Sequence, residues 1–251
     1  MNVVVNGLMT SYQKVGNGKE IIVCIHGWGD SGKAFSGLIE ELSSDYTFLI
    51  LDLPGFGGTQ PPDGAWGTSD YAAFVAAWLK KINAPVPLGI IAHSFGGAVA
   101  IMGLSKGTLK SKKLILIASS GIRDIKRLRK MLLKATAKAG KIPLYIAPVK
   151  TRTQTRKKFY RAIQSDRFLL PHMEKIYRKI ITEDVQKAAH TLKLPTLLIY
   201  GCQDKGSPPL YGQILNQAIN KSRLEIITGS GHFLHQEQPR QVAKLIKDFL
   251  G

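Results

Sequence analysis

Ser94 stands at a corner where a strand pattern gives way to a helix pattern. The apolar run Leu88–Ala92 leads into it. After the corner come the small apolar residues Gly97–Met102, whose pattern is typical of a helix. A turn this sharp strains the serine backbone and brings strand and helix nearly into contact, so the positions two before and two after the serine must be small. Ala92 and Gly96 meet that requirement. The turn would hold the serine hydroxyl clear of the sheet, beside the free N–H groups of the new helix, as an activated nucleophile requires.

The usual form of this turn is G-x-S-x-G. Ala92 stands in place of its first glycine and adds only one methyl group. A pentapeptide of this kind also occurs at ordinary helix starts, where the serine is only a buried residue of the first turn. The remainder of the chain must therefore decide between a nucleophile and a structural serine.

A serine hydroxyl is a weak nucleophile until a base removes its proton, and an orienting carboxylate commonly holds that base. Asp204 follows the predicted strand Thr196–Tyr200, and His232 follows the next predicted strand after a glycine-rich turn. The glycines permit a tight loop that carries the imidazole toward Ser94. The order Ser, Asp, His along the chain is the one that nucleophile-elbow hydrolases use. We therefore predict a catalytic triad of Ser94, His232 and Asp204.

Two other residues compete for these roles. His235 lies three residues beyond His232 at a helix entrance, and Asp124 follows the predicted strand Lys113–Ala118. We favour His232 as the base, and we favour Asp204 as the acid because Asp124 opens a predicted helix, where it can serve the helix dipole. No cluster of acidic residues or cysteines completes a metal site around His232 and His235, so we expect no metal.

The elements that must position these residues alternate between short apolar runs and amphipathic stretches. Several runs are apolar on both faces, which is typical of the middle of a parallel sheet covered by helices on both sides. Helical spacing recurs in Phe35–Leu42, in Tyr71–Ile82 and in a last helix that begins at Pro239. The predicted strands are Ile21–Ile25, Tyr46–Leu51, Leu88–Ala92, Lys113–Ala118, Thr196–Tyr200 and Arg223–Thr228.

The net charge of +18 is concentrated in one segment. Residues 122–190 hold 19 lysines and arginines against 5 aspartates and glutamates, a net charge of +14, and the rest of the chain carries only +4. Strand patterns disappear from about 122 to 192, and cationic helical patterns take over. We therefore predict an α/β core formed by residues 1–121 and 193–251, with residues 122–192 inserted as a basic helical cap.

With these features combined, the chain resembles an alpha/beta-hydrolase of the carboxylesterase and lipase-like branch over nearly its whole length. Ile25–Asp30 resembles that family's His-Gly oxyanion loop, and Leu51–Gly57 resembles its next turn. The resemblance implies a mostly parallel twisted sheet with helices on both faces and an inserted helical cap. It also implies that the backbone N–H groups of Trp28 and Phe95 form the oxyanion hole. His26 and His93 would have structural roles, bracing the oxyanion loop and packing beneath the turn.

This resemblance predicts a serine hydrolase that cleaves a small-molecule carboxylic ester through an acyl-enzyme, without a cofactor. Trp28, Phe95 and Phe233 are expected to form an apolar acyl pocket with the cap. A carbon–carbon bond hydrolase or a lactonase would use the same triad, and a non-catalytic module binding a small ligand would use the same fold. The serine argues against dehalogenases and epoxide hydrolases, which have an aspartate at this position.

The basic segment has three interpretations: a solvated surface that keeps the protein soluble, a peripheral contact with anionic membranes, or an attraction for acidic substrates or macromolecules. Its aromatic residues are too sparse for single-stranded nucleic acid, so we rank nucleic acid last. The N-terminus has no signal-peptide pattern, and we expect a cytoplasmic protein. Cys24 and Cys202 both follow apolar runs, and we expect two buried free thiols.

Overall fold

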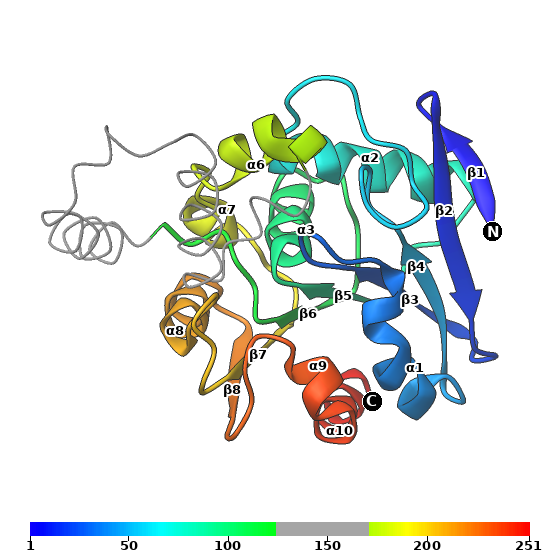
Figure 1. Cartoon of the computed structure of the whole chain (residues 1–251). Helices are drawn as coiled ribbons and strands as arrows, with labels where there is room; N and C mark the ends of the chain where they lie inside the picture. Colours follow the sequence, from blue (N-terminus) through cyan, green and yellow to red (C-terminus); the bar gives the residue numbers. More distant parts are fainter. Residues whose placement is uncertain (124–170) are drawn as a thin grey trace, which may run out of the picture.

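A computed structural model of the chain describes residues 1–123 and 171–251. These residues form a sheet in the order β1-β2-β4-β3-β5-β6-β7-β8, in which β1 and β2 are antiparallel and the other six strands are parallel (Figure 1). The strands are β1 (Asn2–Val5), β2 (Leu8–Val15), β3 (Glu20–Ile25), β4 (Tyr46–Leu51), β5 (Gly89–His93), β6 (Lys113–Ile117), β7 (Thr196–Gly201) and β8 (Ser222–Ile227).

All six predicted strands are present, and each predicted end lies within one residue of the observed end. Successive side chains of a strand point to opposite faces of the sheet, so a strand covered on both sides must be apolar at every position. In β5, Ile90 packs into one buried hydrophobic cluster and Ile91 into the other. The central strands thus have the double burial that their continuous apolar runs indicate.

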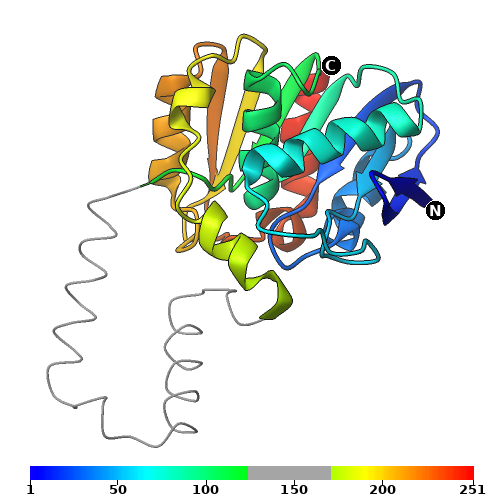
Figure 2. The same ribbon diagram turned by 90° about the horizontal axis from the view of Figure 1, so that it is seen from above.

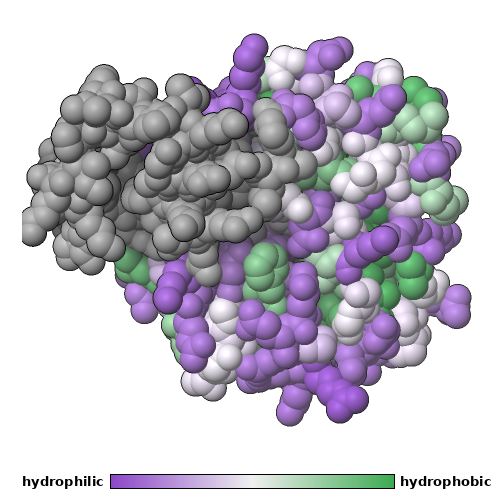
Figure 3. All heavy atoms as spheres, viewed as in Figure 1, coloured by the Kyte–Doolittle hydropathy of each residue, from purple (hydrophilic) through white to green (hydrophobic). Residues whose placement is uncertain are grey.

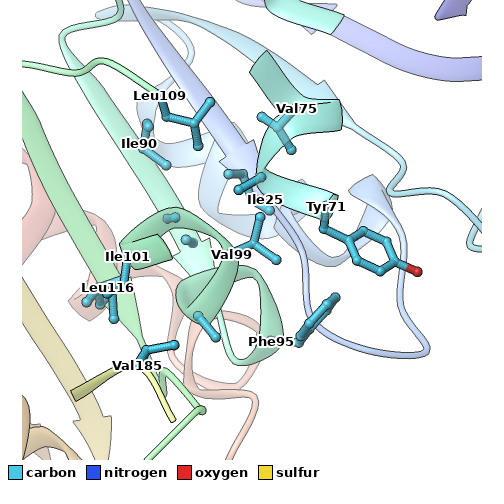
Figure 4. Close-up of a cluster of buried hydrophobic side chains, with 14 of the residues drawn as sticks. Ile25, Tyr71, Val75, Ile90, Phe95, Val99, Ile101, Leu109, Leu116 and Val185 are labelled. Atoms are coloured by element: carbon cyan, nitrogen blue, oxygen red, sulfur yellow. The ribbon is translucent and has the colours of Figure 1, made fainter. Parts of the chain in front are cut away.

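Helices cover both faces of the sheet (Figure 2). Side chains of α2, α3, α7 and α8 pack into the cluster on one face, and those of α1 and α10 pack into the cluster on the other. Figure 4 shows the first cluster, where Val99 of α3 and Val75 of α2 lie beside Ile25 of β3. The helices are η1 (Gly32–Phe35), α1 (Ser36–Leu42), α2 (Thr68–Lys81), α3 (Phe95–Ser105), η3 (Pro171–Met173), α6 (Glu174–Ile180), α7 (Gln186–Ala189), α8 (Pro209–Ala218), α9 (Leu234–Glu237) and α10 (Pro239–Leu250).

The antiparallel hairpin β1–β2 extends the sheet at one edge and was not among the predicted strands. Its turn is Asn6-Gly7, and both residues have positive φ angles, +46° and +84°. Asn-Gly is the sequence most typical of a two-residue hairpin turn, so a signal for this element was present. Thr10 is the one buried residue of β2, and the other residues of the strand are half-buried or exposed, which is why it lacks the apolar run of the central strands.

The segment predicted as a cap leaves the core after β6 and returns before β7. Two hydrogen bonds join its ends: Val185 donates its N–H to the carbonyl of Gly121 at 2.9 Å, and the N–H of Arg123 donates to Asp184 Oδ2 at 3.0 Å. The cationic helix expected after Ile122 falls on residues 124–170 and lies outside the described residues. The return limb contains η3, α6 and α7 and packs on the core through Met173, Ile176 and Val185.

Hydrophilic side chains dominate the coloured surface in Figure 3, and apolar ones form small separate groups among them. None of the helices among residues 1–123 and 171–251 combines the length and apolar character needed to span a membrane.

Candidate active site

Ser94 occupies the corner between β5 and α3, as the sequence predicts. Its φ of +49° lies in the left-handed region, which is a strained conformation for a residue with a side chain. Backbone hydrogen bonds hold it there: the N–H of Ser94 donates to Ile117 of β6 at 3.0 Å, and its carbonyl accepts from Ser120 at 3.0 Å. The neighbouring strand therefore fixes the position of the hydroxyl-bearing residue.

A chain of two side-chain hydrogen bonds connects Ser94, His232 and Asp204. His232 Nε2 lies 3.0 Å from Ser94 Oγ, and His232 Nδ1 lies 2.7 Å from Asp204 Oδ2. A carboxylate can only accept, so Nδ1 carries the hydrogen and Nε2 is left to accept the serine hydroxyl proton. The structure brings together the three side chains that the sequence assigned to catalysis.

Asp204 is held rigidly in the loop after β7. Its side chain is fully buried, and Oδ1 accepts backbone N–H groups from Gly206 at 2.7 Å and Ser207 at 2.9 Å. Three N–H groups, counting that of His232, therefore satisfy a carboxylate that burial would otherwise destabilise. With one oxygen fixed by the backbone, the other is directed at the imidazole.

The loop that carries His232 crosses the end of β7 on its way from β8. Gly201, the last residue of β7, makes this crossing feasible because a β carbon there would lie 2.5 Å from the carbonyl oxygen of Ser230. Gln203 also donates its N–H to that carbonyl at 2.9 Å. The turn starts at Gly229, whose φ is +73°. These glycines give the tight loop that the sequence indicated.

His26 braces the loop after β3, the one that resembles an oxyanion loop. Its Nδ1 donates to the carbonyl of Gly27 at 2.7 Å, and its Nε2 accepts the N–H of Leu53 at 2.9 Å. Burial lowers the pKa of His26, which favours the neutral ring that this donor–acceptor pattern requires. The neighbouring turn is held by Asp52, whose oxygens accept N–H groups from Gly32 at 2.7 Å and Gly58 at 2.9 Å.

The backbone N–H groups of Trp28 and Phe95 lie in the two segments that flank Ser94. Phe95 is the first residue of α3, where a helix leaves its N–H without an internal partner. The loop after β3 lies directly against Ser94, since a β carbon at Gly27 would be 3.2 Å from Ser94 Cβ. The rings of Trp28 and Phe95 contact each other edge to face at 5.8 Å. Both residues thus border the serine, and their assignment to an oxyanion hole is part of the proposal below.

A cavity of about 270 Å³ opens beside Ser94 and His232. Its lining includes Trp28 and Phe95, as expected for a substrate pocket, but Phe233 is not part of the lining. Phe233 is 44% exposed and packs its ring against His93 and His232 instead. From the segment predicted as a cap, the described residues that line the cavity are Ile122, Arg123, Tyr177, Ile180, Ile181, Glu183 and Val185.

The cavity wall is less apolar than the sequence suggested. Glu183 accepts hydrogen bonds from both the backbone N–H and the hydroxyl of Thr68, and both residues line the cavity. Thr68 is the first residue of α2, so the carboxylate of Glu183 caps that helix. Neither residue had been singled out, because a contact across 115 residues leaves no local sequence signal.

Neither competing residue is seen in a catalytic arrangement with Ser94 among the described residues. His235 is buried in α9 and makes no contact with Ser94 that would suit a base; burial and the nearby His232 lower its pKa to about 3. Asp124 lies outside the described residues.

Cys24 and Cys202 are both free, and β5 and β6 separate their strands. The expectation that both thiols are buried is wrong for Cys202, which is exposed because β7 ends one residue earlier.

Comparison with known proteins places these features in a family. Residues 22–245 match the model of the alpha/beta hydrolase family. The chain belongs to this family. Among curated alpha/beta hydrolases, it is 24% identical to 2-hydroxy-6-oxo-2,4-heptadienoate hydrolase of Pseudomonas putida, a match that covers 99% of this chain and 95% of that protein. It is also 25% identical to monoacylglycerol lipase ABHD6 of Rattus norvegicus, over 92% of this chain and 75% of the lipase.

Solved structures confirm the alpha/beta-hydrolase fold. A thermophilic esterase from Thermogutta terrifontis superposes with a TM-score of 0.76 at 19% identity, and the match covers 100% of this chain and 98% of the esterase. The named relatives thus include an esterase, a lipase and a carbon–carbon bond hydrolase. In the described part of the chain, histidine, cysteine and acidic side chains form no group of three that could hold a metal ion.

Proposed function

We propose that this alpha/beta hydrolase is a serine esterase that cleaves carboxylic esters through an acyl-enzyme. The observation that carries the proposal is the hydrogen-bonded chain from Asp204 through His232 to Ser94, with distances of 2.7 and 3.0 Å. The hydroxyl of Ser94 borders a cavity large enough for a small acyl group.

In the first step, Ser94 Oγ attacks the ester carbonyl carbon while His232 Nε2 accepts the hydroxyl proton. The carbonyl oxygen becomes an oxyanion, which the N–H groups of Trp28 and Phe95 would stabilise. Collapse of this intermediate breaks the bond to the alcohol, which leaves with the proton held by His232. Asp204 keeps the ring oriented and favours the imidazolium. Water then attacks the acyl carbon in the same way, with His232 as the base, and this step releases the acid and restores Ser94.

The test uses a fluorophosphonate and a series of p-nitrophenyl esters of increasing chain length. We expect labelling of the wild-type serine and hydrolysis of short esters, and both should be lost in S94A while the melting temperature stays within a few degrees. A folded wild-type protein that is not labelled would favour a small-ligand binding module on the same fold.

A carbon–carbon bond hydrolase is the second candidate, because the Pseudomonas putida relative is named for that activity and covers nearly the whole chain. A lactonase would use the same nucleophile. Parallel assays with a 2-hydroxy-6-oxo-dienoate and with an acyl lactone separate these activities. A kcat/KM for either substrate that exceeds the best ester by tenfold or more would replace the esterase assignment while keeping the triad.

We also propose that the segment 122–190 makes a peripheral contact with anionic membranes. Its net charge of +14 supports this contact. Co-sedimentation with anionic and neutral vesicles at low and at physiological salt is the measurement. Binding to anionic vesicles that weakens with salt is the expected result, and equal, negligible binding to both kinds of vesicle would remove the idea.

A further inference from the structure

His93 precedes the nucleophile directly and has no part in the mechanism described above. It is the last residue of β5, its side chain is almost fully buried, and it packs against His232 of the loop after β8 and His235 of α9. Its ring centroid is 4.9 Å from that of His232 and 4.4 Å from that of His235. The residue next to Ser94 therefore packs against the segment that supplies the base.

One nitrogen of His93 holds the backbone of the catalytic histidine. His93 Nε2 lies 3.0 Å from the carbonyl oxygen of His232. A carbonyl only accepts, so Nε2 carries the hydrogen and Nδ1 is unprotonated in the neutral ring. Burial and the neighbouring His235 and His232 keep the pKa of His93 well below its usual value, in agreement with a neutral ring.

The other nitrogen of His93 has no hydrogen-bond partner among the described residues. Nδ1 is buried and faces the oxyanion loop, where a β carbon at Gly27 would lie 2.9 Å from it. An unpartnered buried acceptor destabilises the fold, and an apolar side chain would avoid that penalty. An imidazole at this position is therefore explained by its one satisfied group, the Nε2–H donor.

The residues just before His232 have anchors of their own, since Gly231 donates its N–H to Glu237 at 2.7 Å and Gln238 donates to Ser230 Oγ at 2.6 Å. At His232 itself, the backbone carbonyl is held by His93 Nε2. On the other side of His232, the ring of Phe233 packs against His93 and His232 but is 44% exposed. The ring of His232 must nevertheless reach both Ser94 and Asp204 within hydrogen-bond distance. A displacement of about 1 Å at a reacting group is enough to lower the rate about 100-fold.

We propose that His93 is a positioning residue for the base: its Nε2–H holds the His232 carbonyl so that the imidazole bridges Ser94 and Asp204. This inference rests on the proposed function of the triad. It assigns to the residue before the nucleophile a role in the turnover rate, in addition to packing beneath the turn.

The experiment compares two substitutions of nearly equal shape, His93→Gln and His93→Met. Glutamine places an amide N–H donor close to the position of Nε2, whereas methionine has no donor. We expect H93M to lower kcat on a p-nitrophenyl ester by about 10- to 100-fold with KM within twofold. H93Q should recover most of that loss. The rate of fluorophosphonate labelling of Ser94 should fall in parallel with kcat.

His235→Phe is the matched control. Both ring nitrogens of His235 are buried without a hydrogen-bond partner among the described residues, so phenylalanine keeps the packing against His93 and removes no hydrogen bond. We expect kcat within about twofold of the wild type. If H93M does not fold, H93F provides the second variant without a donor.

Equal values of kcat in H93Q and in the donor-free variant would overturn the inference, whether both match the wild type or both are impaired. That outcome is distinguishable from a failure of the proposed function. If the proposed function fails, the wild-type protein itself will neither be labelled nor hydrolyse esters.

Discussion

Gly96 lies directly against the backbone carbonyl of Ile25, so that a β carbon at position 96 would overlap its oxygen. The same atom would lie 2.6 Å from the carbonyl oxygen of His26. The first turn of α3 therefore touches the end of β3, which brings the N–H of Phe95 beside the loop that contains Trp28. One glycine determines how closely these two backbone segments can approach.

Substitution of Gly96 by alanine should push α3 away from β3. We expect a loss of free energy of unfolding at the upper end of about 1–3 kcal/mol, because the clash is with rigid backbone, and a loss of kcat of at least tenfold. Urea unfolding and ester hydrolysis measure the two effects. The control is G37A in α1, where the new β carbon would lie 3.5 Å from Pro239 Cβ, an ordinary contact. A G96A protein as stable and active as G37A would contradict this account.

Asp204 and Asp124 can be distinguished by one substitution each. In D204N the amide oxygen can keep the N–H bonds from Gly206 and Ser207, but an amide N–H can no longer accept from His232 Nδ1. By analogy with the serine protease triad, kcat should fall by about 10³- to 10⁴-fold with little change in melting temperature. D124N should keep wild-type kcat. A large loss in D124N with D204N active would transfer the role to Asp124.

Buried histidines should make the fold sensitive to acid. Burial lowers the pKa of His26, His93 and His235, the last to about 3, whereas the unfolded chain binds protons near 6.5. Since the unfolded state binds more protons below pH 6.5, stability falls as the pH decreases from about 6.5 toward 3. In H235F the slope should decrease by up to about 1.4 kcal/mol per pH unit. Urea midpoints from pH 8 to 4 test this, and a slope equal to that of the wild type would contradict it.

The two cysteines should react with thiol reagents at very different rates. Cys202 is exposed, whereas Cys24 is buried in β3 and burial raises the pKa of its thiol. Only the thiolate reacts, so we expect one equivalent of thiol in native protein and two in denaturant, measured with Ellman's reagent. C202S should have no rapidly reacting thiol, while C24A should retain it. Two fast equivalents in the native state would mean that β3 is accessible.

Glu183 should influence both stability and substrate binding. E183A removes the acceptor for the N–H and hydroxyl of Thr68, so the free energy of unfolding should fall by about 1 kcal/mol through loss of the cap on α2. Because both residues line the cavity, KM for p-nitrophenyl esters should change more than kcat. E174Q, which disrupts an exposed pair with Arg178, is the control and should cost less than about 0.5 kcal/mol. Equal effects of the two substitutions would contradict this role.

Much of this architecture could be predicted because burial on both faces leaves a continuous apolar run in the sequence, as in β4 and β5. The polar residues that follow such runs converge at one sheet edge, which is why Ser94, Asp204 and His232 could be chosen before their distances were known. The helix α8 was not predicted, although Pro208-Pro209 is a favoured way to begin one.

Other features depend on contacts that no local pattern encodes. The pairing of Glu183 with Thr68 and of His93 with the His232 carbonyl joins residues more than 100 positions apart. The exposure of Cys202 depends on where β7 ends, and a shift of one residue moves a side chain from the sheet into a turn. Phe233 was expected in the pocket with Trp28 and Phe95, but its ring packs against His93 and His232, is 44% exposed and does not line the cavity.

The hydrogen bonds between Val185 and Gly121 and between Arg123 and Asp184 hold together the two ends of the segment that separates β6 from β7. Polypeptide entering and leaving through neighbouring positions can be lengthened, shortened or exchanged with little disturbance to the domain that hosts it. Ser94, Asp204 and His232 all lie outside that segment. Under the proposed function, exchange of this segment alone would change part of the cavity wall while leaving the proposed triad in place.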